Sequence, residues 1–136
     1  MKIIGEKING TLKSVQRAIE ERNEEFIIKL ARDQADAGAD WLDVNAGTHP
    51  DRETEDLLWL VRCVQSTVDT PLCLDSTNPE PLAAAVAEIE QTPMINSISL
   101  EPDKLEKILP IAAANSCDVI ALAMDERGIP DTTEER

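Results

Sequence analysis

Basic residues are scarce in this chain of 136 residues, which has 13 lysines and arginines against 27 aspartates and glutamates. The formal net charge of -14 argues against binding to nucleic acid or to an anionic membrane surface, because proteins bind such phosphate groups with patches of lysine and arginine. We interpret most of the acidic excess as solvated helix surface. No apolar run approaches the roughly 18 residues of a membrane span and no signal peptide is recognisable, so we expect a cytoplasmic protein with no membrane attachment.

Cysteine and histidine are also rare. Cys63, Cys73 and Cys117 form no Cys-x-x-Cys pair and His49 is the single histidine, so neither a disulfide framework nor a metal cluster is predicted. Cys73 and Cys117 are interpreted as small buried side chains, the protein is expected in a reducing compartment, and His49 is interpreted as a surface loop residue. The sequence also lacks a Gly-x-Gly-x-x-Gly motif, a P-loop and a nucleophile elbow, which argues against nicotinamide and nucleotide chemistry.

Five short apolar segments do stand out, each separated from the next by a helical pattern. The expected strands cover residues 2–5, 41–45, 71–75, 94–98 and 118–124. Strands this short and apolar indicate an α/β fold with a parallel sheet buried on both faces. Their onsets recur near the roughly 30 residues per βα unit of an eight-stranded barrel. We therefore expect residues 1–136 to form one domain, with parallel βα units that make about the first five strands of a truncated (β/α)8 TIM barrel.

Capping residues and helical periodicity predict the segments between the strands. The expected helices are a short one capped by Ser14, one from Asn23 to Gly38, one over 52–68, one with Pro79 in its first turn, and one from about Pro102 to Asn115. Thr132 and Thr133 resemble the cap and first turn of a further helix.

Three of the expected strands end in a carboxylate or a carboxamide. The segments are Leu42-Asp43-Val44-Asn45, Leu72-Cys73-Leu74-Asp75 and Met94-Ile95-Asn96-Ser97. A parallel α/β fold gathers these carboxyl ends at one rim, where such folds bind ligands. Strand alternation sends Asp43, Asn45, Asp75 and Asn96 to the inner face, together with Cys73, Met94 and Ile98. Inner carboxylates need hydrogen-bond donors, so the predicted ligand is polar, flat and rich in donors.

Local structural roles compete with this interpretation. Asp43 and Asp75 could instead cap the loops or helices that follow, although Ser76, Thr77 and Asn78 can provide such caps after Asp75. Glu6 and Asn9 follow the first expected strand, either as rim ligands or as residues of a turn at Asn9-Gly10. Asp125-Glu126 is either a second acidic part of the rim or a polar loop.

Together these segments closely resemble a known family. Ile3-Ile4-Gly5-Glu6-Lys7-Ile8-Asn9-Gly10 and the strand endings above, extended to Asn78, are similar to the methyltetrahydrofolate:corrinoid/iron-sulfur protein methyltransferases and their corrinoid methyltransferase relatives. The likeness continues from Asp118 to Pro130 and covers essentially the whole chain in order and spacing. The wider pterin-binding group, which includes dihydropteroate synthase and the folate module of cobalamin-dependent methionine synthase, is similar at Gly5-Glu6 or at the Asp75 strand.

The resemblance implies a pterin-binding barrel that passes the N5 methyl group of methyltetrahydrofolate to the cobalt of a corrinoid (cobalamin-type) cofactor on a partner protein. Asp75 and Asn96 match pterin-binding positions of the family, and Asp43 supports them. The expected substrate-binding set is completed by Asn9, Glu6, Asn45 and Ser97. No metal ligand is expected, and the family's catalytic asparagine lies on strands beyond residue 136.

Two other functions stay open at this point. A dihydropteroate synthase-like enzyme would share Asp75 and Asn96, although Glu6-Lys7-Ile8-Asn9 departs from that family's first loop. A non-catalytic pterin-binding or assembly module would follow if five strands are the natural extent of the protein. Open strand edges and an uncovered inner face predict a homo-oligomer, such as a homodimer.

Overall fold

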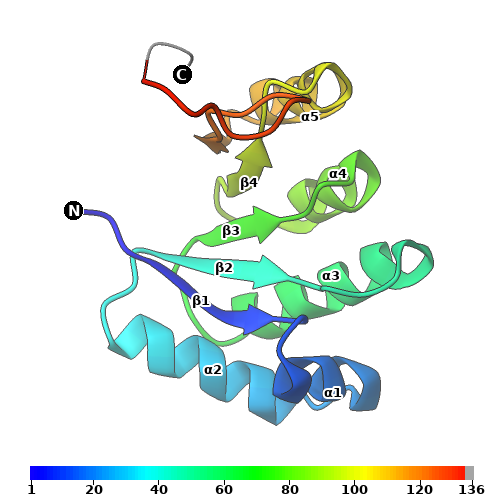
Figure 1. The fold of residues 1–136 in the computed structure, drawn as a ribbon. Helices are drawn as coiled ribbons and strands as arrows, with labels where there is room; N and C mark the ends of the chain where they lie inside the picture. Colours follow the sequence, from blue (N-terminus) through cyan, green and yellow to red (C-terminus); the bar gives the residue numbers. More distant parts are fainter. Residues whose placement is uncertain (134–136) are drawn as a thin grey trace.

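Parallel strands alternate with helices in the computed structural model, which describes residues 1–133. The strands are β1 (Ile4–Asn9), β2 (Trp41–Asn45), β3 (Leu72–Asp75), β4 (Met94–Ile98) and β5 (Asp118–Ala121). The helices are α1 (Lys13–Glu21), α2 (Glu24–Asp36), α3 (Pro50–Gln65), α4 (Pro79–Glu88) and α5 (Pro102–Ala114). Figure 1 shows the strands fanning out in chain order with the helices along one side. Among residues 1–133, no helix is long and apolar enough to cross a membrane.

The sheet order is β1-β2-β3-β4-β5, and every neighbouring pair is parallel. Each strand is added beside the one before it in the same direction, as in a βα barrel. A doubly wound sheet would instead reverse its direction at a switch point. The α/β class and the βα repeat of the first part of a TIM barrel are thereby confirmed.

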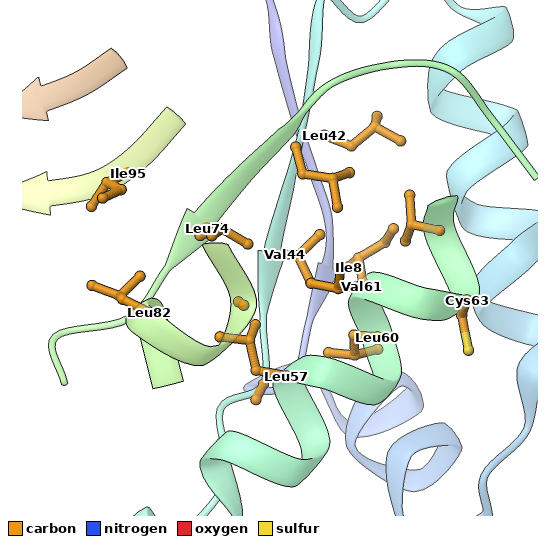
Figure 2. Packing of buried hydrophobic residues seen from close by; sticks show 14 of the residues in the cluster. Ile8, Leu42, Val44, Leu57, Leu60, Val61, Cys63, Leu74, Leu82 and Ile95 are labelled. Atoms are coloured by element: carbon orange, nitrogen blue, oxygen red, sulfur yellow. The ribbon is translucent and has the colours of Figure 1, made fainter. Parts of the chain in front are cut away.

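A single hydrophobic layer joins the sheet to its helices. Leu42 and Val44 of β2 and Leu74 of β3 are fully buried and meet α3 and α4, as Figure 2 shows with Leu57 and Leu82. Each such side chain stabilises the fold by about 1.5–3 kcal/mol relative to an exposed one. Leu72, Leu74 and Ile95 belong to the same core, as expected for the residues that alternate with the inner-face side chains of these strands.

The first strand differs from the prediction. It runs from Ile4 to Asn9 rather than over residues 2–5, so Glu6 and Asn9 lie within it rather than after it. Its pairing with β2 is irregular between Gly5 and Ile8, and Gln34 Oε1 accepts a hydrogen bond from the Lys7 amide there at 2.8 Å. A Cβ atom on Gly5 would lie 2.7 Å from that oxygen. Gly5 therefore makes room for Gln34 instead of ending the strand.

Both expected boundary residues of α2 are right, whereas the expected cap of α1 is wrong. Asn23 caps α2, because its Oδ1 accepts from the Phe26 amide at 3.2 Å. Gly38 has a φ of +89°, which suits the residue after the cap at the end of a helix. Ser14 does not cap α1, which begins at Lys13 after Leu12. The turn at Asn9 places Leu12 at the start of the helix before Ser14 is reached.

Smaller corrections concern α3, β4 and β5. Helix α3 spans Pro50–Gln65 rather than 52–68, and β5 ends at Ala121 rather than at residue 124. Ile98 joins the helix-side core instead of the inner face, because the β4–β5 register shifts between Asn96 and Ile98. Residues 131–133 form bends in place of the predicted helix start, and its continuation lies outside the described residues.

The open edges of the sheet generate the first prediction. Within the described residues β1 pairs with β2 alone and β5 with β4 alone, and the large side chains of Ile3, Leu122 and Ile129 are exposed. Open edges and apolar patches promote association. We predict that a polypeptide limited to residues 1–136 forms dimers or larger assemblies in sedimentation experiments. A monodisperse monomer that binds no hydrophobic dye would contradict this.

Candidate functional site

Two pairs of carboxylate and carboxamide side chains meet at the carboxyl ends of β2, β3 and β4. Asn45 Nδ2 donates to Asp75 Oδ2 at 2.7 Å, and Asn96 Nδ2 donates to Asp43 Oδ1 at 3.1 Å. Asp75 and Asn96 are direct partners in the β3–β4 register. The structure thus brings four of the predicted site residues together. Each carboxamide gives its nitrogen to a carboxylate, which leaves its oxygen as an acceptor for a ligand.

Asp43 is the most buried of the four, with 2% of its surface exposed. The pKa of its carboxyl is raised to about 6, first by burial and to a smaller extent by the charges of Asp75 and Glu6, while the hydrogen bond from Asn96 opposes the shift. Cys73 lies on the same face of the sheet, where burial first and the Asp43 charge second raise the pKa of its thiol well above the usual range. The cysteine is therefore a neutral, buried neighbour, as predicted.

Asp75 does not cap helix α4. Its carboxylate accepts from Asn45 rather than from the amides of α4. Of the three residues that could cap α4, Asn78 occupies the N-cap position, but its side chain makes no capping bond. Pro79 and Pro81 have no N–H at the first and third helical positions, so the helix offers an N-cap side chain few donors.

Asn9 serves the turn after β1. Its Oδ1 accepts from the Thr11 amide at 2.9 Å and from Thr11 Oγ1 at 2.7 Å. This is the turn alternative that the Asn9-Gly10 dipeptide indicates. The turn also contacts the end of β2, since the Gly10 amide donates to the Asn45 carbonyl at 2.8 Å. A Cβ on Gly10 would lie 1.7 Å from the Ala46 carbonyl oxygen, so this backbone contact requires glycine. Asn9 and Asn45 are consequently register partners at the rim.

The remaining candidates lie around this network. Glu6 is exposed on β1, and its charge acts on Asp43. Ser97 is half-buried and follows Asn96 across a cis peptide bond. Asp125 forms an ion pair with Arg127 at 2.8 Å, which favours the polar-loop interpretation of Asp125-Glu126. Among residues 1–133, no group of three or more acidic, histidine or cysteine side chains is placed to hold a metal ion.

Within the described residues, no hydrogen bond or ion pair joins His49, Cys63 or Cys117 to the four side chains of the rim network. The His49 side chain is 75% exposed and caps α3, with Nδ1 3.2 Å from Asp51 Oδ2, so its surface position is confirmed. Cys63 is buried, whereas Cys117 is only half-buried and not fully buried as predicted.

One residue of this region gave no signal in the sequence. Glu53 of α3 accepts hydrogen bonds from Ser76 Oγ and Asn78 Nδ2, in the loop that follows Asp75. No motif marks it. The available clue was topological, because a residue in the first turn of the helix after β2 lies beside the loop after β3 in consecutive βα units.

The raised pKa of Asp43 predicts a pH-dependent stability. An unfolded aspartate loses its proton near pH 3.9 and the folded one near pH 6, so the folded state binds the proton more tightly. The free energy of unfolding should therefore fall by up to about 3 kcal/mol as the pH rises from about 4 to about 6. In the Asp43→Asn variant the new carboxamide still accepts from Asn96 and has no such cost. Denaturant unfolding at pH 4 and pH 8 should show the smaller drop in the variant, and equal drops in both proteins would refute the assignment.

Comparison with known proteins identifies the family of this chain. Residues 5–136 match the family described as pterin binding enzyme. The whole chain is 44% identical over 138 residues to the methylcorrinoid:tetrahydrofolate methyltransferase of Eubacterium limosum, of which it covers 51%. It is 26% identical over 140 residues to the methionine synthase of Mycobacterium leprae (strain TN), with 98% of this chain and 12% of that protein covered. The chain thus spans about half the length of the first relative, and it belongs to the pterin binding enzyme family.

Proposed function

We propose that this rim binds the pterin of methyltetrahydrofolate and that the protein transfers the N5 methyl group between this folate and a corrinoid carried by a partner protein. The observation that carries the proposal is the pairing of Asp75 with Asn96 at the ends of adjacent strands, with Asn45 and Asp43 holding them. The name of the Eubacterium limosum relative supports the reaction, and the family match supports the ligand.

The donor pattern of a pterin suits these side chains. Its pyrimidine ring presents an N–H and an adjacent amino group along one edge, and a carboxylate can accept from both in charge-assisted hydrogen bonds. Asp75 has one oxygen already bonded to Asn45, but a carboxylate has about four lone-pair sites, so it can accept again. The oxygen of Asn96 adds an acceptor on the neighbouring strand. Asp75 is thus assigned the pyrimidine edge and Asn96 the position beside it.

The chain's contribution to the reaction is to bind and orient the folate. The corrinoid, when bound on its partner protein, supplies the cobalt that takes up or returns the methyl group. N5 is a poor leaving group until it carries positive character, and negative charge around the ring stabilises that character in the transition state. Glu6, Asp43 and Asp75 provide carboxyl groups at this rim. The proposal also includes a cytoplasmic location, supported by the free cysteines. For a polypeptide limited to residues 1–136 it includes a homo-oligomeric state, supported by the open edges of the five-stranded sheet.

Asp75→Asn tests the assignment of the pyrimidine edge. The amide replaces one acceptor oxygen by a donor, so a donor of the pterin meets a donor of the protein. We expect the affinity for methyltetrahydrofolate to fall by roughly 2–4 kcal/mol in titration calorimetry of the complete protein that contains residues 1–136. Asp118→Asn is the matched control, because Asp118 is an exposed aspartate at the opposite end of β5. Unchanged affinity in Asp75→Asn would remove Asp75 from the site.

Asn96→Ala tests the neighbouring position and separates binding from stability. The variant loses the oxygen offered to the pterin and the donor that Asp43 uses. Folate affinity and the single-turnover rate of methyl transfer should fall, with about 1–3 kcal/mol lost in binding. The melting temperature without folate should fall more at pH 8 than at pH 5, because charged Asp43 needs the donor more than neutral Asp43 does. A lower melting temperature with unchanged affinity and rate would make Asn96 part of the scaffold only.

A further inference from the structure

A single glutamate ties the loop after Asp75 to helix α3. Glu53 lies in the first turn of α3 and accepts from Ser76 Oγ through Oε1 and from Asn78 Nδ2 through Oε2. Both partners belong to the Asp75-Ser76-Thr77-Asn78 loop, 23 and 25 residues further along the chain. Both oxygens of Glu53 are therefore committed to the loop.

Ser76 transmits this contact to the backbone. Only 4% of Ser76 is exposed, and its hydroxyl has one hydrogen, which is donated to Glu53. The hydroxyl oxygen then accepts from the Asn78 amide at 3.0 Å. One carboxylate thus orders the hydroxyl, the side-chain amide and a backbone amide of the loop. Ser76 follows Asp75 directly, so the contact with Glu53 holds the backbone next to Asp75.

The βα unit formed by β2 and α3 therefore supports Asp75 from two sides. Asn45, at the end of β2, donates to the Asp75 carboxylate, and Glu53, at the start of α3, holds the residue that follows it. A carboxylate in the first turn of a helix is favoured by the partial positive charge of the helix N-terminus, which suits Glu53 to this place.

We infer that Glu53 is a positioning residue for Asp75, which keeps the Asp75 carboxylate in the orientation that accepts from the pterin. This inference rests on the proposed function. Recognition of a flat, donor-bearing edge requires the acceptor within about 0.5 Å of its place, and such precision comes from supporting hydrogen bonds rather than from the contacting residue alone. Glu53 does not touch the pterin in this assignment.

The test is a double-mutant cycle on the affinity for methyltetrahydrofolate, measured by calorimetry on the complete protein that contains this chain. Glu53→Gln keeps the size of the side chain but presents a donor to one of its two donor partners. We expect it to raise the dissociation constant by roughly 5- to 20-fold, the range of one well-placed hydrogen bond. In the Asp75→Asn background the same change should have less than about a twofold effect, because the residue it positions is already impaired.

Two further variants control the cycle. Ser76→Ala keeps the Glu53 carboxylate and removes only the hydroxyl. It should weaken folate binding in the unmodified background and have little effect in the Asp75→Asn background, and it replaces Glu53→Gln in the cycle if that variant does not fold. Glu80→Gln changes an exposed glutamate in the first turn of the next helix and should leave the affinity unchanged. Melting temperatures without folate report any effect on the scaffold separately.

The outcomes separate this inference from the proposed function. An equal loss of affinity in both backgrounds, or a lower melting temperature with unchanged affinity, overturns the positioning role of Glu53. If Asp75→Asn weakens binding while neither Glu53→Gln nor Ser76→Ala does, the inference fails and the proposed function stands. If Asp75→Asn binds the folate like the unmodified protein, the pterin assignment itself fails and the inference fails with it.

Discussion

The burial of carboxylates on the inner face of a parallel sheet is the constraint on which the rest of this site depends. Asp43 is almost fully buried, and an inner carboxylate without donors would cost several kcal/mol. The chain meets this need with carboxamides at the ends of its own strands, Asn96 for Asp43 and Asn45 for Asp75. The donors that make the buried acids tolerable also fix their orientation, so the requirement of stability and the requirement of a pre-organised site are met by the same bonds.

This arrangement depends on the strict separation of the two faces of each strand. In β2 the helix-side residues Leu42 and Val44 are fully buried in the hydrophobic core, while Asp43 and Asn45 alternate with them in sequence and face the other way. A slip of one residue in register would bury both polar groups under α3 and expose the leucine and the valine. The core therefore holds the register, and the register determines which acid meets which amide.

The positions of the strand-end residues could be predicted because they follow from local rules. A period of two and the shared rim of parallel strands were enough to bring Asp43, Asp75 and Asn96 together. What could not be predicted depends on partners far along the chain. The sequence alone favours Gly5 as the end of a strand. Its role inside the strand is not visible locally, because the side chain that occupies the space beside it, Gln34, comes from α2.

The roles of Asn78 and Glu53 escaped prediction for the same reason. The sequence of Asn78-Pro79 favours a capping asparagine, and a rule for single residues takes no account of a second proline at the third helical position. Such a rule also cannot show that the side-chain Nδ2 of Asn78 donates to Glu53 of α3. Local propensity predicted the structure correctly where the hydrogen-bond partners lie close in sequence. It failed where a side chain from another βα unit supplied the partner.

The shape of the pterin determines where N5 lies relative to the residues that bind the pyrimidine edge. In the proposed assignment Asp75 and Asn96 meet the pyrimidine edge of the pterin, and N5 belongs to the other ring. A flat bicyclic ligand held by β3 and β4 along one edge thus directs N5 away from these strands, toward the opposite side of the barrel that the βα repeat begins to form. Groups that donate to N5 or protonate it are then expected on elements across the barrel from β3 and β4. In the proposed assignment the carboxyl groups of Glu6, Asp43 and Asp75 act on the ring through charge, and the groups that activate N5 belong to other elements than β3 and β4.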